Sequence, residues 1–403
     1  ARNARQIAAT FPKNQFIINE YVWAIYDGYL KRSEGSQIDE DELGNDEDNS
    51  DSEIISVAFP MMEQAAKRIL ELTTKILPLK RAVFAICKEA KRLKKWEVMY
   101  WFAQQLDPKL LSTEQTEYNG RRLTSDYQVW LYSITRSLLE LQRYEECITY
   151  AREGIEKFPD GSLHFQRWEA LAKIYSGQVE EGLRQLEYID VRFPKQWYIQ
   201  GDIGRAYSRL GKYDDAWLWF CKAAAAQGDI KGRVLVLVSM VDVLQHRENW
   251  QAAYDHLLLI WAIEVSQSSE QRAARTRQRI LEFRKHHTDH ITVNTEEVEG
   301  KTPSISAALK LCRASWQKTI NASRPRSKGK IESLNEEKQF GFIANESGRF
   351  HFKFKALTMR DRPLVGMEVE FETEQSYDQK RGQQSTTAIN IRPAKNTGQS
   401  HSI

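Results

Sequence analysis

Residues 197–227 read WYIQGDIGRAYSRLGKYDDAWLWFCKAAAAQ, and this stretch decides the fold of most of the chain. Apolar and small residues recur at helical spacing on both sides of Gly211, which stands where a turn would join two helices. Gly204 lies before the turn, and Ala216 and Phe220 lie after it. Small residues let two antiparallel helices approach closely, while the ring fills the remaining space. The stretch therefore predicts one helix-turn-helix unit.

The same unit recurs along the chain. The Phe-Pro pair at 158–159 returns at 193–194, 35 residues later, and Gly177 precedes Gly211 by 34 residues. Weaker copies place an aromatic or apolar residue where Tyr213 stands, at Trp96, Tyr144, Val179 and Trp250. One such unit cannot bury its apolar face alone, so units of this length stack into a solenoid. We expect at least five helix pairs.

These repeats resemble the tetratricopeptide family. The resemblance implies an all-α helical solenoid over residues 54–265, whose stacked pairs leave a concave groove. Such a groove takes a peptide, a partner helix or an extended nucleic acid, and we expect a protein partner there. The aromatic run of Trp96, Tyr100, Trp101 and Phe102 is either core, which helical spacing favours, or a recognition surface.

Residues 1–38 are expected to form an N-terminal helical region, with Trp23 and Tyr26 at helical spacing. Residues 39–53 contain nine acidic residues and no basic one, interleaved with Gly and Asn, which is typical of a solvated, disordered loop. The sequence opens at Ala1 without a secretory signal, which leaves open a trimmed N-terminus or a longer chain.

Basic residues gather after the repeats. Residues 270–330 contain fourteen Lys or Arg against six Asp or Glu. A solenoid needs a polar face on its last helices, which accounts for such charges. The alternative is a basic lane for a polyanion, leading onward through Arg324, Arg326 and Lys328.

Two basic capping helices are expected within residues 266–322, followed by a linker over 323–328. The first helix covers 269–287. The second covers 302–319, with Thr302 as its N-cap and Pro303 in its first turn.

From Gly329 the helical period gives way to short alternating runs separated by turn residues, which predict several β-strands closing into a small barrel. Residues 329–343 read GKIESLNEEKQFGFI, residues 349–357 read RFHFKFKAL, and residues 364–371 read LVGMEVEF. These motifs, in this order, resemble a cold-shock domain, which has the OB-fold. The resemblance covers residues 329–393 and leaves 394–403 as an expected disordered tail.

Period two puts Phe340 and Phe342 on one face of a strand, with Gly341 keeping the other face free of bulk. Aromatic faces stack on bases of any identity, and nearby cations neutralise phosphates. The resemblance implies stacking by Phe340, Phe342, His351 and Phe354. It implies phosphate contacts by Lys330, Lys338 and Lys353.

The sequence departs from the usual cold-shock pattern at four positions. Ser333 stands where a stacking tryptophan is usual, and Glu332 stands where a lysine is frequent. Gln339 replaces a glycine and His351 replaces a phenylalanine. The loss of one ring and the reversal of one charge would weaken nucleic-acid binding.

Several classes of protein lack support in the sequence. No apolar stretch is long enough to cross a bilayer, so no membrane partner is expected. The four cysteines have no paired spacing, which favours a cytoplasmic protein. His286 and His290 have the spacing of metal ligands but lack a third ligand. No catalytic motif, cofactor or metal site is expected.

The sequence therefore predicts a multidomain chain, an all-α repeat solenoid followed by a small all-β barrel. The expected function is that of a non-enzymatic adaptor. It would bind single-stranded RNA, or less favourably DNA, through the barrel and a protein partner through the repeats. Two alternatives stay open: a scaffold that binds only proteins, and the regulatory part of a larger enzyme.

Overall fold

The computed structural model of the chain describes residues 2–11, 14–31, 52–118, 121–194, 196–294, 300–324, 326–358, 362–378 and 383–394. Most of the predicted acidic loop and nearly all of the predicted C-terminal tail lie outside these residues. The chain divides into two compact units. The first comprises residues 1–186 and 266–270, and the second comprises residues 187–265 and 271–403.

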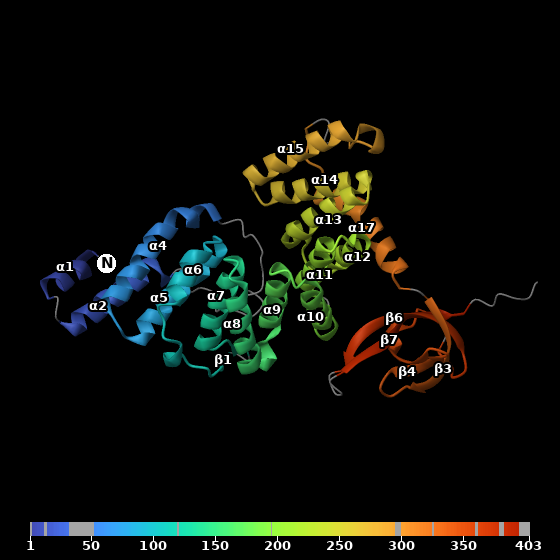
Figure 1. The fold of residues 1–403 in the computed structure, drawn as a ribbon, viewed down its shortest axis with the longest axis horizontal. Helices are drawn as coiled ribbons and strands as arrows, with labels where there is room; N and C mark the ends of the chain where they lie inside the picture. Colours follow the sequence, from blue (N-terminus) through green and yellow to red (C-terminus); the bar gives the residue numbers. More distant parts are fainter. Residues whose placement is uncertain are drawn as a thin grey trace, which may run out of the picture. The chain divides into compact units, whose positions relative to one another are not determined.

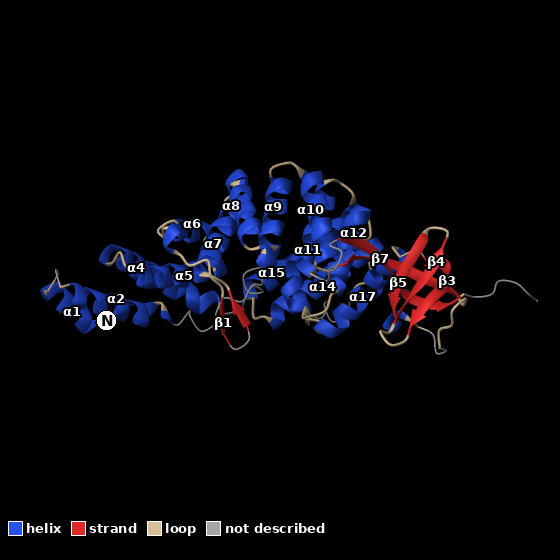
Figure 2. Ribbon diagram, turned by 90° about the horizontal axis from the view of Figure 1, so that it is seen from below, coloured by secondary structure: helices blue, strands red, loops and turns tan. Residues whose placement is uncertain are grey.

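The first unit consists of consecutive helices that each pack on the next (Figure 1). These helices are α1 (Arg2–Thr10), α2 (Gln15–Tyr29), α4 (Ser52–Leu72), α5 (Ile76–Arg92), α6 (Trp96–Ala103), α7 (Asp126–Glu140), α8 (Tyr144–Lys157), α9 (Leu163–Tyr175) and α10 (Val179–Arg192), the last of which crosses into the second unit. A short antiparallel hairpin, β1 (Thr116–Tyr118) and β2 (Arg121–Leu123), interrupts them between α6 and α7 (Figure 2). This hairpin was not predicted from the sequence.

The second unit contains further helices and, at its C-terminal end, a β-barrel. Its helices after α10 are α11 (Trp197–Arg209), α12 (Tyr213–Ala225), α13 (Val234–His246), α14 (Trp250–Ser266), α15 (Glu270–His286) and α17 (Ile305–Ala322). None of the helices in the described part of the chain is both long and apolar enough to cross a membrane.

The repeat register is the predicted one. The five residues aligned in the sequence are each the first residue of a helix: Trp96 in α6, Tyr144 in α8, Val179 in α10, Tyr213 in α12 and Trp250 in α14. The turns before α10 and α12 contain glycines with positive φ, +99° at Gly177 and +70° at Gly211. Side chains with a Cβ rarely adopt this backbone conformation, so glycine is favoured in these turns. It is not required by the repeat, because the equivalent turns hold Lys94, Gln142 and Glu248 with φ of +54°, +60° and +55°.

Small residues hold the helices of a pair close together. A Cβ added at Gly204 of α11 would lie 2.6 Å from the Phe220 ring of α12. Ala216 is fully buried at the same contact. In the aromatic run on α6, Phe102 is fully buried in the core, whereas Trp101 is 42% exposed.

The two basic helices are present, and the second begins and ends three residues later than the predicted range of 302–319. Helix α15 matches its predicted range to within a residue at each end. Helix α17 begins at Ile305 instead of the first turn predicted around Pro303, because Ser304 is the N-cap. The Ser304 hydroxyl accepts a hydrogen bond from the Ala307 N–H at 3.2 Å. A serine cap satisfies a helix N–H that would otherwise lack a partner.

Five strands close the C-terminal barrel in the order β3-β4-β5-β7-β6. They are β3 (Arg326–Asn335), β4 (Phe340–Asn345), β5 (Gly348–Lys353), β6 (Glu368–Asp378) and β7 (Gln383–Pro393). All neighbouring pairs are antiparallel except β5 and β7. The first strand begins at Arg326, so part of the expected linker belongs to the barrel.

In the described part of the chain, the buried core of the barrel consists of barrel residues. Its buried side chains are Ile331, Ile343, Phe352, Val369, Phe371, Ala388 and Ile391. They occupy inward positions of the five strands. On β7 the alternation is broken between Ala388 and Ile391, where Asn390 has a φ of +49°. The outward positions of the same strands form the surface on which the candidate site lies.

Candidate nucleic-acid interface

Strand β4 presents two phenylalanine rings on the outside of the barrel. Gly341 and Ile343 are buried, whereas Phe340 and Phe342, which alternate with them, are half-buried. The outward face of a pleated strand holds every second residue, so both rings lie on that face. The face predicted for them from period two is the one they occupy.

His351 of β5 joins these rings. It is paired with Phe342 in the strand register, and its ring centroid lies 5.5 Å from that of Phe342 and 5.3 Å from that of Phe340. The two phenylalanine centroids are 5.9 Å apart. We call Phe340, Phe342 and His351 the aromatic cluster. Three adjacent, partly exposed rings are the kind of surface on which unpaired bases stack.

Gly341 keeps the strand beneath the cluster in place. A Cβ at this position would lie 2.6 Å from Cζ of Phe352, whose ring fills the barrel interior, and 2.7 Å from the Ser333 carbonyl oxygen. Contacts this short force the neighbouring strand or ring to move. The glycine therefore serves the inner packing that holds Phe340 and Phe342 at the surface.

Two of the predicted phosphate-binding lysines lie beside the cluster. Lys353 is exposed and is paired with Phe340 across β4 and β5. Lys338 is exposed in the turn before Phe340, where its backbone N–H donates to Asn335 Oδ1 at 2.8 Å. Cations at these positions can neutralise phosphates of a strand whose bases contact the rings.

Phe354 lies apart from the cluster. The chain leaves β5 after Lys353 and enters a short 3-10 helix, η6 (Phe354–Ala356), so the alternation ends there. The Phe354 ring is half-buried against the barrel core, 6.2 Å from the Phe352 ring centroid. Its backbone N–H donates to the Gln339 carbonyl at 2.9 Å. In this structure Phe354 packs on the core, which differs from the stacking position implied by the resemblance.

Lys330 and the expected basic lane face a row of carboxylates. Outward glutamates on β6 stand opposite basic residues of β3, with Arg326 paired to Glu372, Lys328 to Glu370 and Lys330 to Glu368. The Lys330–Glu368 ion pair measures 3.5 Å.

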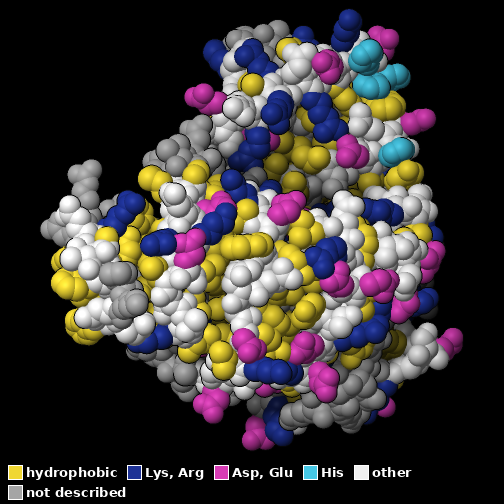
Figure 3. All heavy atoms as spheres, turned by 60° about the vertical axis from the view of Figure 1, so that its left-hand side comes forward, with side chains coloured by type: hydrophobic (Ala, Val, Ile, Leu, Met, Phe, Trp, Pro, Cys, Tyr) yellow, Lys and Arg dark blue, Asp and Glu magenta, His cyan; other side chains and the backbone are white. Residues whose placement is uncertain are grey.

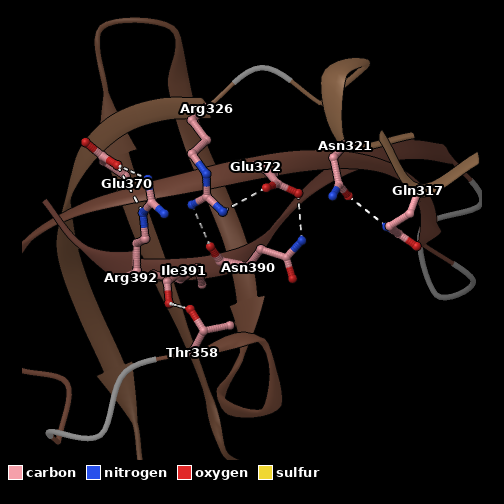
Figure 4. Close-up of polar contacts among 9 residues, drawn as sticks. All are labelled: Gln317, Asn321, Arg326, Thr358, Glu370, Glu372, Asn390, Ile391 and Arg392. Atoms are coloured by element: carbon pink, nitrogen blue, oxygen red, sulfur yellow. Dashed lines mark hydrogen bonds and ion pairs between the residues drawn. The ribbon is translucent and has the colours of Figure 1, made fainter. Parts of the chain in front are cut away.

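Figure 4 shows the centre of this ion-pair row: Arg326 points to Glu372 at 2.9 Å, and Arg392 of β7 reaches Glu370, also at 2.9 Å. The hydrogen bond from Arg392 is the main reason that the pKa of the Glu370 carboxyl lies below its ordinary value. Arg324, just before the barrel, pairs with Glu374 at 3.0 Å. Arg324 and Arg326 are thus matched by carboxylates, which argues against an unopposed basic lane. The alternating glutamates at 368–374 were the signal for this row in the sequence.

The basic residues of α15 also make local contacts. Arg279 pairs with Asp242 of α13 at 2.8 Å, and the Arg277 guanidinium lies 5.8 Å from the Trp261 ring centroid of α14. On the face of the molecule in Figure 3, Lys and Arg side chains are interspersed with Asp and Glu side chains. These contacts are those of a solvated helix that covers the end of a repeat stack.

His286 and His290, which have ligand spacing in the sequence, show no further ligand. Among the described residues, His, Cys, Asp and Glu side chains form no group of three or more that could hold a metal ion. His287 between them stacks on Trp250 with ring centroids 4.0 Å apart. This histidine therefore packs at the contact between α14 and the end of α15.

One cation at the aromatic cluster, Arg349, was not predicted from the sequence. Arg349 of β5 places its guanidinium 3.9 Å from the centroid of the Phe342 ring and forms an ion pair with Glu332 of β3. Period two along β5 would have found it, because Arg349 precedes His351 by two residues and therefore shares its face.

Comparisons with known proteins identify no family for this chain. No family model matches it, and no curated protein matches it either. Solved structures do match, among them a chain described as "Computational Design of Self-Assembling Cyclic Protein Homooligomers". That match is 10% identical, covers 79% of this chain and 98% of the other, and has a TM-score of 0.13. A TM-score this low supports no conclusion about the fold or function of this chain.

Proposed function

We propose that the chain is a non-enzymatic adaptor that binds single-stranded nucleic acid, RNA in preference to DNA, through its C-terminal barrel. The observation that carries the proposal is the aromatic cluster, three partly exposed rings on adjacent strands with Lys338 and Lys353 beside them. This combination of rings and cations suits an unpaired strand, because stacking needs no base identity and the cations contact phosphates.

The proposal extends to the families that the sequence resembles. A cold-shock-like barrel would use Phe340, Phe342 and His351 for bases and Lys338 and Lys353 for phosphates. The tetratricopeptide-like repeats would bind a protein partner in their groove, as stacked helix pairs commonly do. Lys330, which pairs with Glu368, contributes less in this proposal.

A titration of the full chain with fluorescent single-stranded oligonucleotides tests the proposed function. Each base that loses its stacking partner costs about 1 to 3 kcal/mol, so Phe340→Ala or Phe342→Ala should weaken binding by about fivefold to a hundredfold. The affinity of the unmodified chain should fall between low and moderate salt. Parallel RNA and DNA oligonucleotides of the same sequence measure the expected preference.

Phe16→Ala is the matched control, since Phe16 is 73% exposed on α2, far from the barrel in sequence. This variant should bind as the unmodified chain does. Absence of binding at low salt, or equal binding by all three variants and the unmodified chain, would refute the proposed function.

A scaffold that binds only proteins is the second candidate. It is favoured by Leu364 and Val365, which are 63% and 64% exposed between β5 and β6. Exposed apolar neighbours of this kind are suited to a protein contact. Co-purification of one stoichiometric protein that resists nuclease and is lost in a Leu364→Ser, Val365→Ser variant would favour this candidate.

A further inference from the structure

The ladder between β3 and β4 contains an irregularity next to the aromatic cluster. Ile331 pairs with Ile343 and Ser333 pairs with Phe342, so the register shifts between these two pairs. Glu332 is the extra residue in this bulge and has no partner on β4. A bulge re-aims the side chain that it carries. In this barrel the re-aimed side chain is a carboxylate at the edge of the cluster.

That carboxylate reaches across β4 to the next strand. Glu332 on β3 forms an ion pair with Arg349 on β5, and Ala344, the β4 residue paired with Arg349, is small. The guanidinium lies 3.9 Å from the Phe342 centroid, within van der Waals contact of the ring. Arg349 therefore covers a surface of Phe342 that a base would need for stacking.

The contact that covers the ring is weak enough to be exchanged. The side chains of Arg349 and Glu332 are 55% and 47% exposed, and ion pairs at such positions contribute little net stability. A guanidinium also binds phosphate oxygens in a bidentate manner, which makes a nucleic-acid strand a suitable competitor for Glu332.

We propose that Arg349 is a further nucleic-acid-binding residue and that Glu332 positions it as a displaceable cap on Phe342. When a single strand binds, the guanidinium leaves Phe342 and Glu332 and contacts a phosphate, and a base takes its place on the ring. The inference rests on the proposed function of the barrel. It predicts that Phe342 is a conditional stacking site, which becomes available only when Arg349 leaves the ring.

Salt dependence tests the phosphate contact. Each phosphate contact to a single strand adds about 0.7 to the slope of log affinity against log salt. Arg349→Gln should therefore lower the slope by about 0.7, which means about threefold less loss of affinity between about 50 and 200 mM salt. A residue that only braces the barrel would leave this slope unchanged.

A double-mutant cycle tests the positioning role of Glu332. Glu332→Gln should tighten binding by about fivefold, because the cap no longer competes with a stacked base. The same substitution in an Arg349→Gln chain should give no such gain. Glu346→Gln is the matched control, since it removes an equal charge from the turn between β4 and β5.

The outcomes separate the cap from the function of the barrel. Suppose that the unmodified chain binds the oligonucleotide and that Phe340→Ala weakens this binding. If Arg349→Gln then leaves the salt slope unchanged, the phosphate contact of Arg349 is refuted, while the proposed function of the barrel stands. If Glu332→Gln tightens binding equally with and without Arg349, or no more than Glu346→Gln does, simple repulsion explains it and the cap is refuted. If no variant binds at low salt, both proposals fail.

Discussion

Gln339 immediately precedes Phe340, the first residue of β4, and its backbone φ is +53°. The left-handed region costs an ordinary side chain about 1 to 2 kcal/mol, a cost that glycine avoids. The Gln339 side chain offsets part of this by donating from Nε2 to the Glu336 carbonyl at 2.6 Å. Gln339, which stands where the cold-shock pattern usually has glycine, therefore has a backbone conformation that favours glycine.

We expect Gln339→Gly to stabilise the barrel by about 1 kcal/mol, because it relieves the left-handed conformation. Native-state hydrogen exchange of the β3 and β4 amides in the full chain measures this as slower exchange. Gln375→Gly is the control, since Gln375 lies in extended strand β6, where glycine should destabilise by about 0.5 to 1 kcal/mol. Equal effects at both positions would contradict the role of φ.

Individual site residues could be predicted only where the alternation of a strand continues. Phe340 and Phe342 were placed on one face by period two, and the structure has them there. Phe354 lies past the end of β5, where the chain turns and the rule no longer applies. The contact between Arg349 and Glu332 depends on a bulge, and no spacing along one strand predicts which residue of its partner is skipped.

Helix starts could be predicted where the repeats align, but not where two caps compete. Trp96, Tyr144, Val179, Tyr213 and Trp250 could be aligned because each repeat reuses the same packing position. The start of α17 was predicted too early, since Thr302 and Ser304 are both suitable caps and only the fold selects Ser304.

Helix α17, which leads into the barrel, is held to α14 by a buried histidine. His256 Nε2 accepts a hydrogen bond from the Trp316 indole N–H at 2.8 Å, and its Nδ1 lies 2.7 Å from the Ala252 carbonyl oxygen. This arrangement assigns the only ring proton to Nδ1. Burial lowers the pKa of His256 to about 4, because the charged ring would lose its hydration.

The pairing of α14 with α17 should therefore weaken in acid. The unfolded chain takes up a proton near pH 6.5, whereas folded His256 stays neutral until about pH 4. The contribution of His256 to the free energy of unfolding is complete above pH 6.5 and falls by about 3 kcal/mol as the pH drops to 4. Denaturant titrations across this range measure it.

His256→Gln provides the comparison, because glutamine keeps polar atoms near Trp316 but does not titrate. The difference in unfolding free energy between the two proteins should change with pH between 6.5 and 4. The carboxyl of Asp255, whose pKa burial raises to about 6, is present in both and largely cancels. A difference that is constant with pH would mean that His256 takes up a proton as readily in the folded state as in the unfolded one, and would contradict the lowered pKa.

At the scale of the whole chain, composition predicted two unlike parts but not how charge is matched between distant residues. The basic residues before and within β3 looked unopposed, because their partners on β6 lie far along the chain; Glu372, for example, comes 46 residues after Arg326. Only closure of the barrel brings the two rows together. The net charge of a segment is therefore a poor guide to a polyanion site when a strand partner is unknown.

The separate cores of the helices and the barrel allow the binding function to be assigned to one part. The helical core around α12, α14 and α17 contains residues up to Ile320, and the barrel core begins at Ile331. A chain that ends at Ser323 should keep its helical circular dichroism and thermal transition, because no side chain of the barrel core belongs to that cluster.

The same shortened chain should lose oligonucleotide binding, since the aromatic cluster and its lysines lie beyond Ser323. The shortened chain keeps the basic helices α15 and α17. Comparing its binding with that of the full chain therefore distinguishes a site on the barrel from a site on those helices. Loss of binding with intact helices assigns the nucleic-acid contact to the barrel. If the shortened chain instead binds with the salt slope of the full chain, the nucleic-acid contact lies on the basic helices. An unchanged slope means that the same number of counterions is released without the barrel.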